Sequence, residues 1–178
     1  SVFSKSDEYK NYDAAKVFNE GKGKIQENNK AITEKMEAEK KRKEEEFAAN
    51  QQKLVDQLKA GMQSTPSGLY YKITKTTNGV APKAGDQVSV HYAGKLVDGS
   101  EFDSSFKRNQ PIDIPIGMGQ VIKGWDEGIL LLKEGETATL LIPSELGYGA
   151  RGAGGVIPPN AWLVFDVELV KVKSNAVK

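Results

Sequence analysis

The chain has 178 residues, with 25 lysines and arginines against 24 aspartates and glutamates, one histidine and no cysteine. This length allows one domain of ordinary size with an appendage. The charges balance in both halves of the chain, so we expect no nucleic-acid partner. The lack of cysteine excludes disulfides and thiol catalysis, and a single histidine cannot build a multi-histidine site, so we expect no metal and no cofactor. No apolar run approaches the roughly 18 residues of a membrane span.

Residues 1–65 are predicted to form a polar, helical N-terminal arm. Ser6-Asp7 can cap a short first helix, which Gly21 and Gly23 should interrupt. From about residue 24 to 60 the chain has no glycine or proline, and it is rich in glutamate, lysine, alanine and glutamine. This composition favours one long helix, and we expect the helix to end at Gly61.

The apolar residues of the long helix share one face. They are Ile25, Ile32, Met36, Phe47, Leu54 and Leu58. The charged stretch between Met36 and Phe47 cannot lie in a core, so the helix is either a solvated spacer or packs only at its ends. Because large apolar side chains are costly to leave in water, we expect residues 1–65 to form a homodimer. The alternative is a monomer whose helix docks on its own second domain.

Residues 66–178 change character and are predicted to form a second domain after a short linker. Strand patterns occupy the segments 68–75, 87–96, 110–117, 136–143 and 162–172. The segment VDGSEF is predicted to be a turn, and residues 124–135 fit a short helix with Trp125 on its apolar face. We therefore expect an α+β fold, an antiparallel half-barrel sheet wrapped over a short helix and preceded by the helical arm.

The segment Gly147–Gly152 reads G-x-G-x-x-G, which also occurs in dinucleotide-binding loops. A nucleotide site would need a helix to open on the last glycine. Two further glycines and a Pro-Pro pair follow instead, and these do not start a helix. A long hairpin loop between two strands explains the glycines better.

Machinery for acid–base or nucleophilic catalysis is scarce. Ser104 and Ser105 have only His91 as a partner base, and His91 falls on a predicted strand, where we expect a structural role. Asp126 and Glu127 are expected to be capping or surface residues. Aromatic and aliphatic residues beside turns stand out instead, and together they could line a small, dry pocket for a compact apolar group such as a prolyl ring.

Five motifs occur in an order that resembles a known family: VHYAG, DGSEFDSSFKRNQP, VIKGWDEGI, LGYGARG and IPPNAWLVFDVELV. They resemble the FKBP family of peptidyl-prolyl cis-trans isomerases over about residues 66–173. The layout with a helical arm is similar to exported bacterial members of the Mip and FkpA type. That resemblance implies dimerisation through the arm and a periplasmic or cell-envelope location.

The resemblance implies a set of site residues. The catalytic set is Tyr92, Phe102, Asp103, Trp125, Tyr148 and Phe165, and the substrate-binding set is Arg108, Ile112, Gln120, Val121, Ile122, Gly147, Val156 and Ile157. In the family the tryptophan is the floor under the prolyl ring. The Ile122 N–H and the Tyr148 hydroxyl would donate to ligand carbonyls, and Asp103 would interact at the rim with Tyr92 and Arg108.

This reading implies proline-containing polypeptides and unfolded client proteins as partners, with macrolides as possible inhibitors. Ile112, Gln120 and Ala153 depart from the residues common in the family, which affects macrolide affinity more than isomerisation. The alternative function is a holdase chaperone or a prolyl-peptide binding module in which isomerisation is incidental.

Overall fold

The computed structural model describes residues 13–174. The chain divides into two compact units between Ala48 and Ala49. Apart from Asp13, the helix α1 (Ala14–Leu58) supplies all of the described first unit, and it also supplies the start of the second. The boundary that we predict at residues 65/66 stays a prediction.

The helix α1 begins directly after Asp13, whose Oδ1 accepts a hydrogen bond from the Lys16 N–H at 3.0 Å. It runs through Gly21 and Gly23, so the expected interruption there is wrong. Each glycine costs about 1 kcal/mol relative to alanine, and the strong helix formers around them outweigh that cost. The expected cap at Ser6-Asp7 lies outside the described residues.

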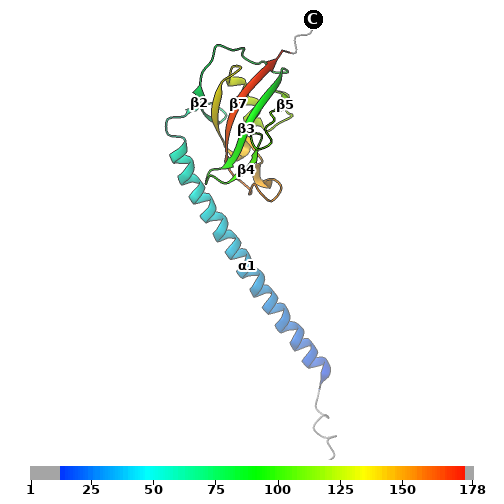
Figure 1. Cartoon of the computed structure of the whole chain (residues 1–178). Coiled ribbons are helices and arrows are strands. Elements are labelled where there is room, and N and C mark those ends of the chain that lie inside the picture. The colour runs from blue at the N-terminus through cyan, green and yellow to red at the C-terminus, as the bar shows by residue number, and fades with distance from the viewer. Residues whose placement is uncertain (1–12, 175–178) are drawn as a thin grey trace, which may run out of the picture. The chain divides into compact units, whose positions relative to one another are not determined.

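The second unit is built on one antiparallel sheet (Figure 1). In the described residues it has seven strands: β1 (Gln63–Ser64), β2 (Tyr70–Lys75), β3 (Gln87–Leu96), β4 (Glu101–Ser104), β5 (Ile112–Pro115), β6 (Thr137–Ile142) and β7 (Leu163–Lys173). The spatial order is β1-β2-β6-β7-β3-β4. The strand β5 also pairs with β3, on the same edge as β4 but at the beginning of β3, whereas β4 pairs near its end. The predicted α+β class is confirmed.

The buried face of the sheet follows the predicted alternation. Val88, Val90 and Tyr92 of β3 are buried, and so are Leu163 and Phe165 of the neighbouring strand β7. The turn predicted at VDGSEF is present at residues 97–99, but the last two residues of this segment, Glu101 and Phe102, begin the strand β4, which was not predicted. Four residues are too few to show an alternation of their own, and β4 is identified by its pairing with β3.

The short helix α2 (Lys123–Gly128) continues into a 3₁₀ turn (Ile129–Leu131) and packs against β6. Two glycines allow the close approach. A Cβ on Gly124 would lie 2.6 Å from Ile142, and one on Gly128 would lie 2.7 Å from Leu140. Trp125 lies between these glycines, so their contact with β6 sets the depth of the indole.

The G-x-G-x-x-G segment belongs to the loop between β6 and β7, as predicted. The two strands pair up to Ile142 and Leu163, and the loop contains 3₁₀ turns at Ser144–Leu146 and Gly149–Arg151. Gly152 has φ of 65°, and a Cβ there would lie 2.1 Å from the Ile157 carbonyl oxygen. This glycine is therefore required by both backbone conformation and space.

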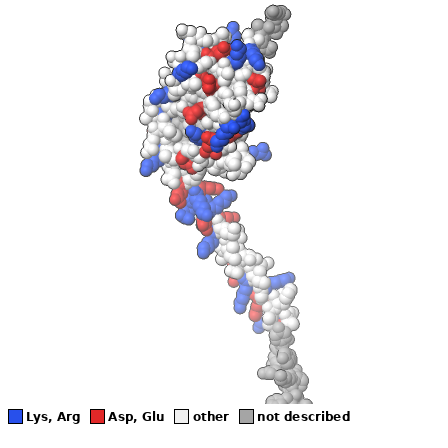
Figure 2. Space-filling view, in the orientation of Figure 1, with Lys and Arg blue, Asp and Glu red and all other residues white. Residues whose placement is uncertain are grey.

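The C-terminal turns of α1 belong to the second unit. Val55 is 1 % exposed and Gln51 is 8 % exposed, whereas Leu58 is 40 % exposed. The side of the helix that is buried therefore differs from the apolar face predicted from the sequence. Acidic and basic side chains mingle on the visible face of the second unit, with no broad field of one sign (Figure 2).

Replacing Gly124 with alanine tests the close packing of α2. We expect the variant to lose about 1–3 kcal/mol of unfolding free energy, because the added methyl group overpacks against Ile142. Urea denaturation measures this change. Gly23→Ala is the control, since no atom lies within 4 Å of a Cβ there. Equal stability of the wild type and Gly124→Ala would contradict the packing described.

Candidate active site

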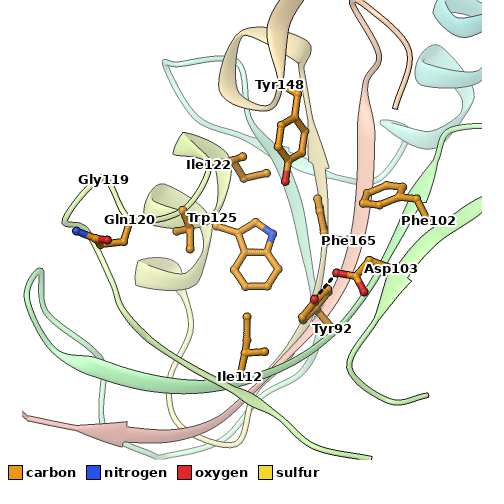
Figure 3. A pocket seen from close by; sticks show the side chains of 11 residues that line it. Tyr92, Phe102, Asp103, Ile112, Gly119, Gln120, Ile122, Trp125, Tyr148 and Phe165 are labelled. Carbon is orange, nitrogen blue, oxygen red and sulfur yellow. Dashed lines mark hydrogen bonds between the residues drawn. The ribbon is translucent and has the colours of Figure 1, made fainter. Parts of the chain in front are cut away.

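A cavity of about 470 Å³ lies between α2, the sheet and the loop after β6 (Figure 3). Its wall is formed by Tyr92, Phe102, Asp103, Ile112, Gly119, Gln120, Val121, Ile122, Trp125, Tyr148 and Phe165. In Figure 3 the Trp125 indole lies between Tyr148 on one side and Ile112 on the other. This size and lining are typical of a site for a small, mainly apolar group.

Four aromatic rings meet edge to face at the floor of the cavity. The Trp125 ring centroid lies 5.0 Å from that of Tyr92 and 5.3 Å from that of Phe165, with interplanar angles of 78° and 86°. Phe102 packs on Phe165 in the same way, at 5.6 Å and 85°. Such pairs are favourable because the positive edge of one ring meets the negative face of the next. The indole is only 4 % exposed and has little freedom to move.

Gly94 of β3 makes room for this cluster. A Cβ at Gly94 would lie 2.7 Å from both Phe102 and Phe165. Gly94 pairs with Phe165 of the neighbouring strand β7 and with Asp103 of β4, on the other side of β3. The missing side chain therefore lets rings from both neighbouring strands approach each other over β3. The motif VHYAG contains this glycine, but only the pairing register shows why it is needed.

Asp103, Tyr92 and Arg108 form a polar network at the rim. The Tyr92 hydroxyl donates a hydrogen bond to Asp103 Oδ2, and Arg108 donates to Asp103 Oδ1 at 2.7 Å and to the Tyr92 hydroxyl oxygen at 2.9 Å. Burial opposes ionisation of Asp103, but the hydrogen bonds from Tyr92 and Arg108 outweigh it and hold the pKa of the carboxyl below its ordinary value. Burial, followed by the bond to Asp103, raises the pKa of Tyr92.

Asp126 ties down the loop that forms one side of the cavity. Its two carboxylate oxygens accept hydrogen bonds from the backbone N–H groups of Gly117 at 2.8 Å and Gly119 at 2.9 Å. Both glycines have φ above 70°, a conformation that other residues rarely adopt. The loop then leads to Val121 and Ile122, which line the cavity. Asp126 therefore anchors this loop from within α2, which is a different role from the capping or surface position expected from the sequence.

Most of the residues implied by the resemblance meet at this cavity. Arg108 is not part of the cavity wall but hydrogen-bonds to two residues that are, Asp103 and Tyr92. Gly147, Val156 and Ile157 also lie outside the wall. Ile157 is buried, and Val156 is exposed. The Gln120 side chain points away from the indole in Figure 3. Gly119 in the wall and Gly94 beneath it were not predicted from the sequence, because both act through backbone geometry and not through a side chain.

His91 and Ser105 form a hydrogen-bonded pair, with His91 Nδ1 2.9 Å from Ser105 Oγ. Ser105 is fully buried, and its hydroxyl oxygen also accepts the Tyr92 N–H at 2.7 Å. The His91 ring stacks on Phe106 with centroids 4.8 Å apart. A buried serine engaged with the backbone cannot reach a substrate, so this arrangement supports the structural role expected for His91.

One buried polar group in the site lacks a hydrogen-bond partner among the described residues, and these residues form neither a metal-binding cluster nor a membrane-spanning helix. The Trp125 Nε1–H is buried and has no hydrogen-bond partner among the described residues. Within residues 13–174, no group of three or more acidic, histidine or cysteine side chains is arranged to hold a metal ion. No helix in the same range is both long and apolar enough to cross a membrane.

The family model for FKBP-type peptidyl-prolyl cis-trans isomerases matches residues 78–170. FK506-binding protein 1 of Dictyostelium discoideum is 57% identical over 106 residues, covering 60% of this chain and 99% of the relative. The isomerase FkpA of Aeromonas hydrophila is 45% identical over 161 residues, covering 90% of this chain and 57% of the relative. The crystal structure of FkpA from Escherichia coli matches with a TM-score of 0.68 and 37% identity, covering 84% of this chain and 71% of that one.

The cavity with its indole floor lies within the matched residues, and the similarity to the FkpA proteins extends into α1. The chain belongs to the FKBP-type peptidyl-prolyl cis-trans isomerase family.

Proposed function

We propose that this cavity accelerates rotation about X-Pro bonds without covalent or acid–base chemistry. Amide resonance opposes the rotation with a barrier of about 18–20 kcal/mol. The twisted amide has lost its conjugation and is less polar across the C–N bond, so an apolar cavity favours it over the planar forms. The observation that supports this most strongly is the aromatic floor, because it offers a shaped apolar surface and no nucleophile paired with a base.

The residues around the cavity suggest separate roles. We assign Trp125 as the floor under the prolyl ring, with Phe102 and Phe165 as walls. The Ile122 backbone N–H and the Tyr148 hydroxyl are assigned as donors to substrate carbonyls. Tyr148 is 40 % exposed and lines the cavity, so its hydroxyl is accessible to a bound peptide.

The substrates proposed are proline-containing segments of unfolded polypeptides. Relatives from Dictyostelium discoideum and Neisseria meningitidis are named FK506-binding proteins, and we propose that macrolides of this kind compete for the same cavity. The similarity to bacterial FkpA proteins supports a periplasmic or cell-envelope location.

NMR exchange spectroscopy on a short X-Pro peptide tests the function directly. Unaided cis-trans exchange takes tens to hundreds of seconds. Catalytic amounts of the protein should bring it into the range of seconds or faster. Stoichiometric binding of the peptide without faster exchange would instead identify a prolyl-peptide binding module.

Activity should be nearly flat between about pH 6 and 9. The lowered pKa keeps Asp103 ionised in this range, and the raised pKa keeps Tyr92 protonated. The stabilising effect of Asp103 is lost only as pH falls through its lowered pKa, and that of Tyr92 only as pH rises above its ordinary pKa. A profile of kcat/KM against pH measures this, and a bell shape centred near neutrality would refute the mechanism.

Asp103→Asn should lower kcat/KM by about five- to tenfold while the fold is retained. The substitution removes the charge that holds both the Tyr92 hydroxyl and Arg108. Asp98→Asn is the matched control, because Asp98 bonds only within its own exposed turn, to the Ser100 N–H, among the hydrogen bonds of the described residues. Normal turnover of folded Asp103→Asn would show that the rim carboxylate is dispensable.

We also propose that the protein is a homodimer formed through residues 1–65. Val17, Phe18, Ile25, Ile32 and Met36 are all exposed on α1 in the single chain. Each large apolar side chain left in water forgoes about 1.5–3 kcal/mol. A second copy would offer the matching apolar face and leave the charged residues of α1 in water.

Light scattering should give a mass of twice 19.4 kDa for the full chain. A fragment starting at Ala49 should be monomeric, and it is preferable to one starting at residue 64 because it keeps the buried Val55. Ile25→Glu should weaken the dimer, while Ala38→Glu, which adds the same charge on the opposite face of the helix, should not. A full-length mass near 19.4 kDa at tens of micromolar would rule the dimer out.

A further inference from the structure

A side chain from α1 holds the base of the loop that carries Tyr148. Gln51 Nε2 donates a hydrogen bond to the Asn160 carbonyl oxygen at 2.9 Å, and Gln51 Oε1 accepts one from the Trp162 N–H at 2.9 Å. Both ends of one amide are thus used on two backbone groups that flank Ala161. Ala161 is itself buried. Nothing in the sequence pattern of α1 sets this glutamine apart from its neighbours.

The bridge connects directly to the cavity. The Asn160 N–H donates to the Gly149 carbonyl oxygen at 2.9 Å, and Gly149 follows Tyr148 in the chain. Asn160 and Gly149 both have φ of 60°, the left-handed conformation. Two hydrogen bonds and one peptide bond therefore connect Gln51, through Asn160 and Gly149, to Tyr148, which lines the cavity.

The left-handed backbone at Asn160 depends on its surroundings. This conformation is uncommon outside glycine, and although asparagine adopts it more readily than most residues, neighbouring contacts help to hold it. Gln51 supplies one contact to the Asn160 carbonyl and one to the Trp162 N–H two residues later, and it is almost wholly shielded from water. Without Gln51, the Asn160 carbonyl and the Trp162 N–H lose their hydrogen-bond partners beneath the helix. Because unpaired buried polar groups are costly, we expect the base of the loop to rearrange until they are paired again.

We propose that Gln51 is a positioning residue for isomerisation, which sets the Tyr148 hydroxyl over the cavity by fixing the base of the loop. The proposal rests on the proposed role of Tyr148 as a donor to substrate. It gives the C-terminal turns of α1 a part in the reaction, although Gln51 lies outside the cavity wall.

The test compares Gln51→Leu with Gln52→Leu in the full chain. Gln52 is the neighbouring exposed glutamine, and its side chain bonds only to Asp56 one helical turn away, among the hydrogen bonds of the described residues. Well below the melting temperature, Gln51→Leu should lower kcat/KM about fivefold, and Gln52→Leu should leave it unchanged. The Gly149 amide resonance should shift only in the Gln51 variant. Unchanged kcat/KM in folded Gln51→Leu would overturn the proposal.

A double-mutant cycle separates positioning from mere stabilisation. In a Tyr148→Phe background, Gln51→Leu should have almost no further effect on kcat/KM, because the hydroxyl that it positions is gone. Independent, multiplying losses would contradict the proposal. Should Gln51→Leu not fold, Gln51→Glu takes its place, since it keeps an acceptor for the Trp162 N–H but replaces the donor to the Asn160 carbonyl with a charged oxygen that repels it. Failure of the wild-type chain to accelerate exchange would reject the proposed function, whereas normal wild-type activity with a normal Gln51 variant rejects only this inference.

Discussion

Edge-to-face packing of Trp125 against Tyr92 and Phe165 is the constraint on which the rest of the site depends. It joins α2 to β3 and β7, and it works only because two close approaches are possible. Gly124 lets the helix come near β6, and Gly94 lets rings from β4 and β7 meet over β3. The floor of the cavity is therefore fixed by the core itself, and no loop has to close to create it.

The polar groups are arranged around this fixed floor. The Asp103 network holds the rim, Asp126 holds the loop that leads to Ile122, and Gln51 holds the base of the loop that carries Tyr148. In each case a side chain hydrogen-bonds to a loop or turn, where the backbone hydrogen bonds of a regular helix or strand are lacking. A site that lowers a rotational barrier by shape needs such rigidity, since a donor misplaced by an ångström no longer distinguishes the twisted amide from the planar one.

The sequence predicts those parts of the molecule that local pattern controls. Alternation identifies β3 and β7, and the motif order identifies the family and with it most of the cavity wall. Long-range contacts are different. β4 is too short to show a pattern, the need for Gly94 depends on the register of three strands, and the role of Gln51 depends on a loop more than a hundred residues away. The continuity of α1 through Gly21 and Gly23 was mispredicted because the propensity of the surrounding residues outweighs two glycines.

In the proposed mechanism the cavity acts by shape and by fixed donors, with no proton transferred in the rate-limiting step. The solvent deuterium isotope effect on kcat/KM for an X-Pro peptide tests it most directly. A mechanism of this kind predicts a ratio of about 1 between rates in H₂O and D₂O, because no O–H or N–H bond breaks in the transition state. A ratio of about 2 or more would show that a proton moves and would contradict this mechanism.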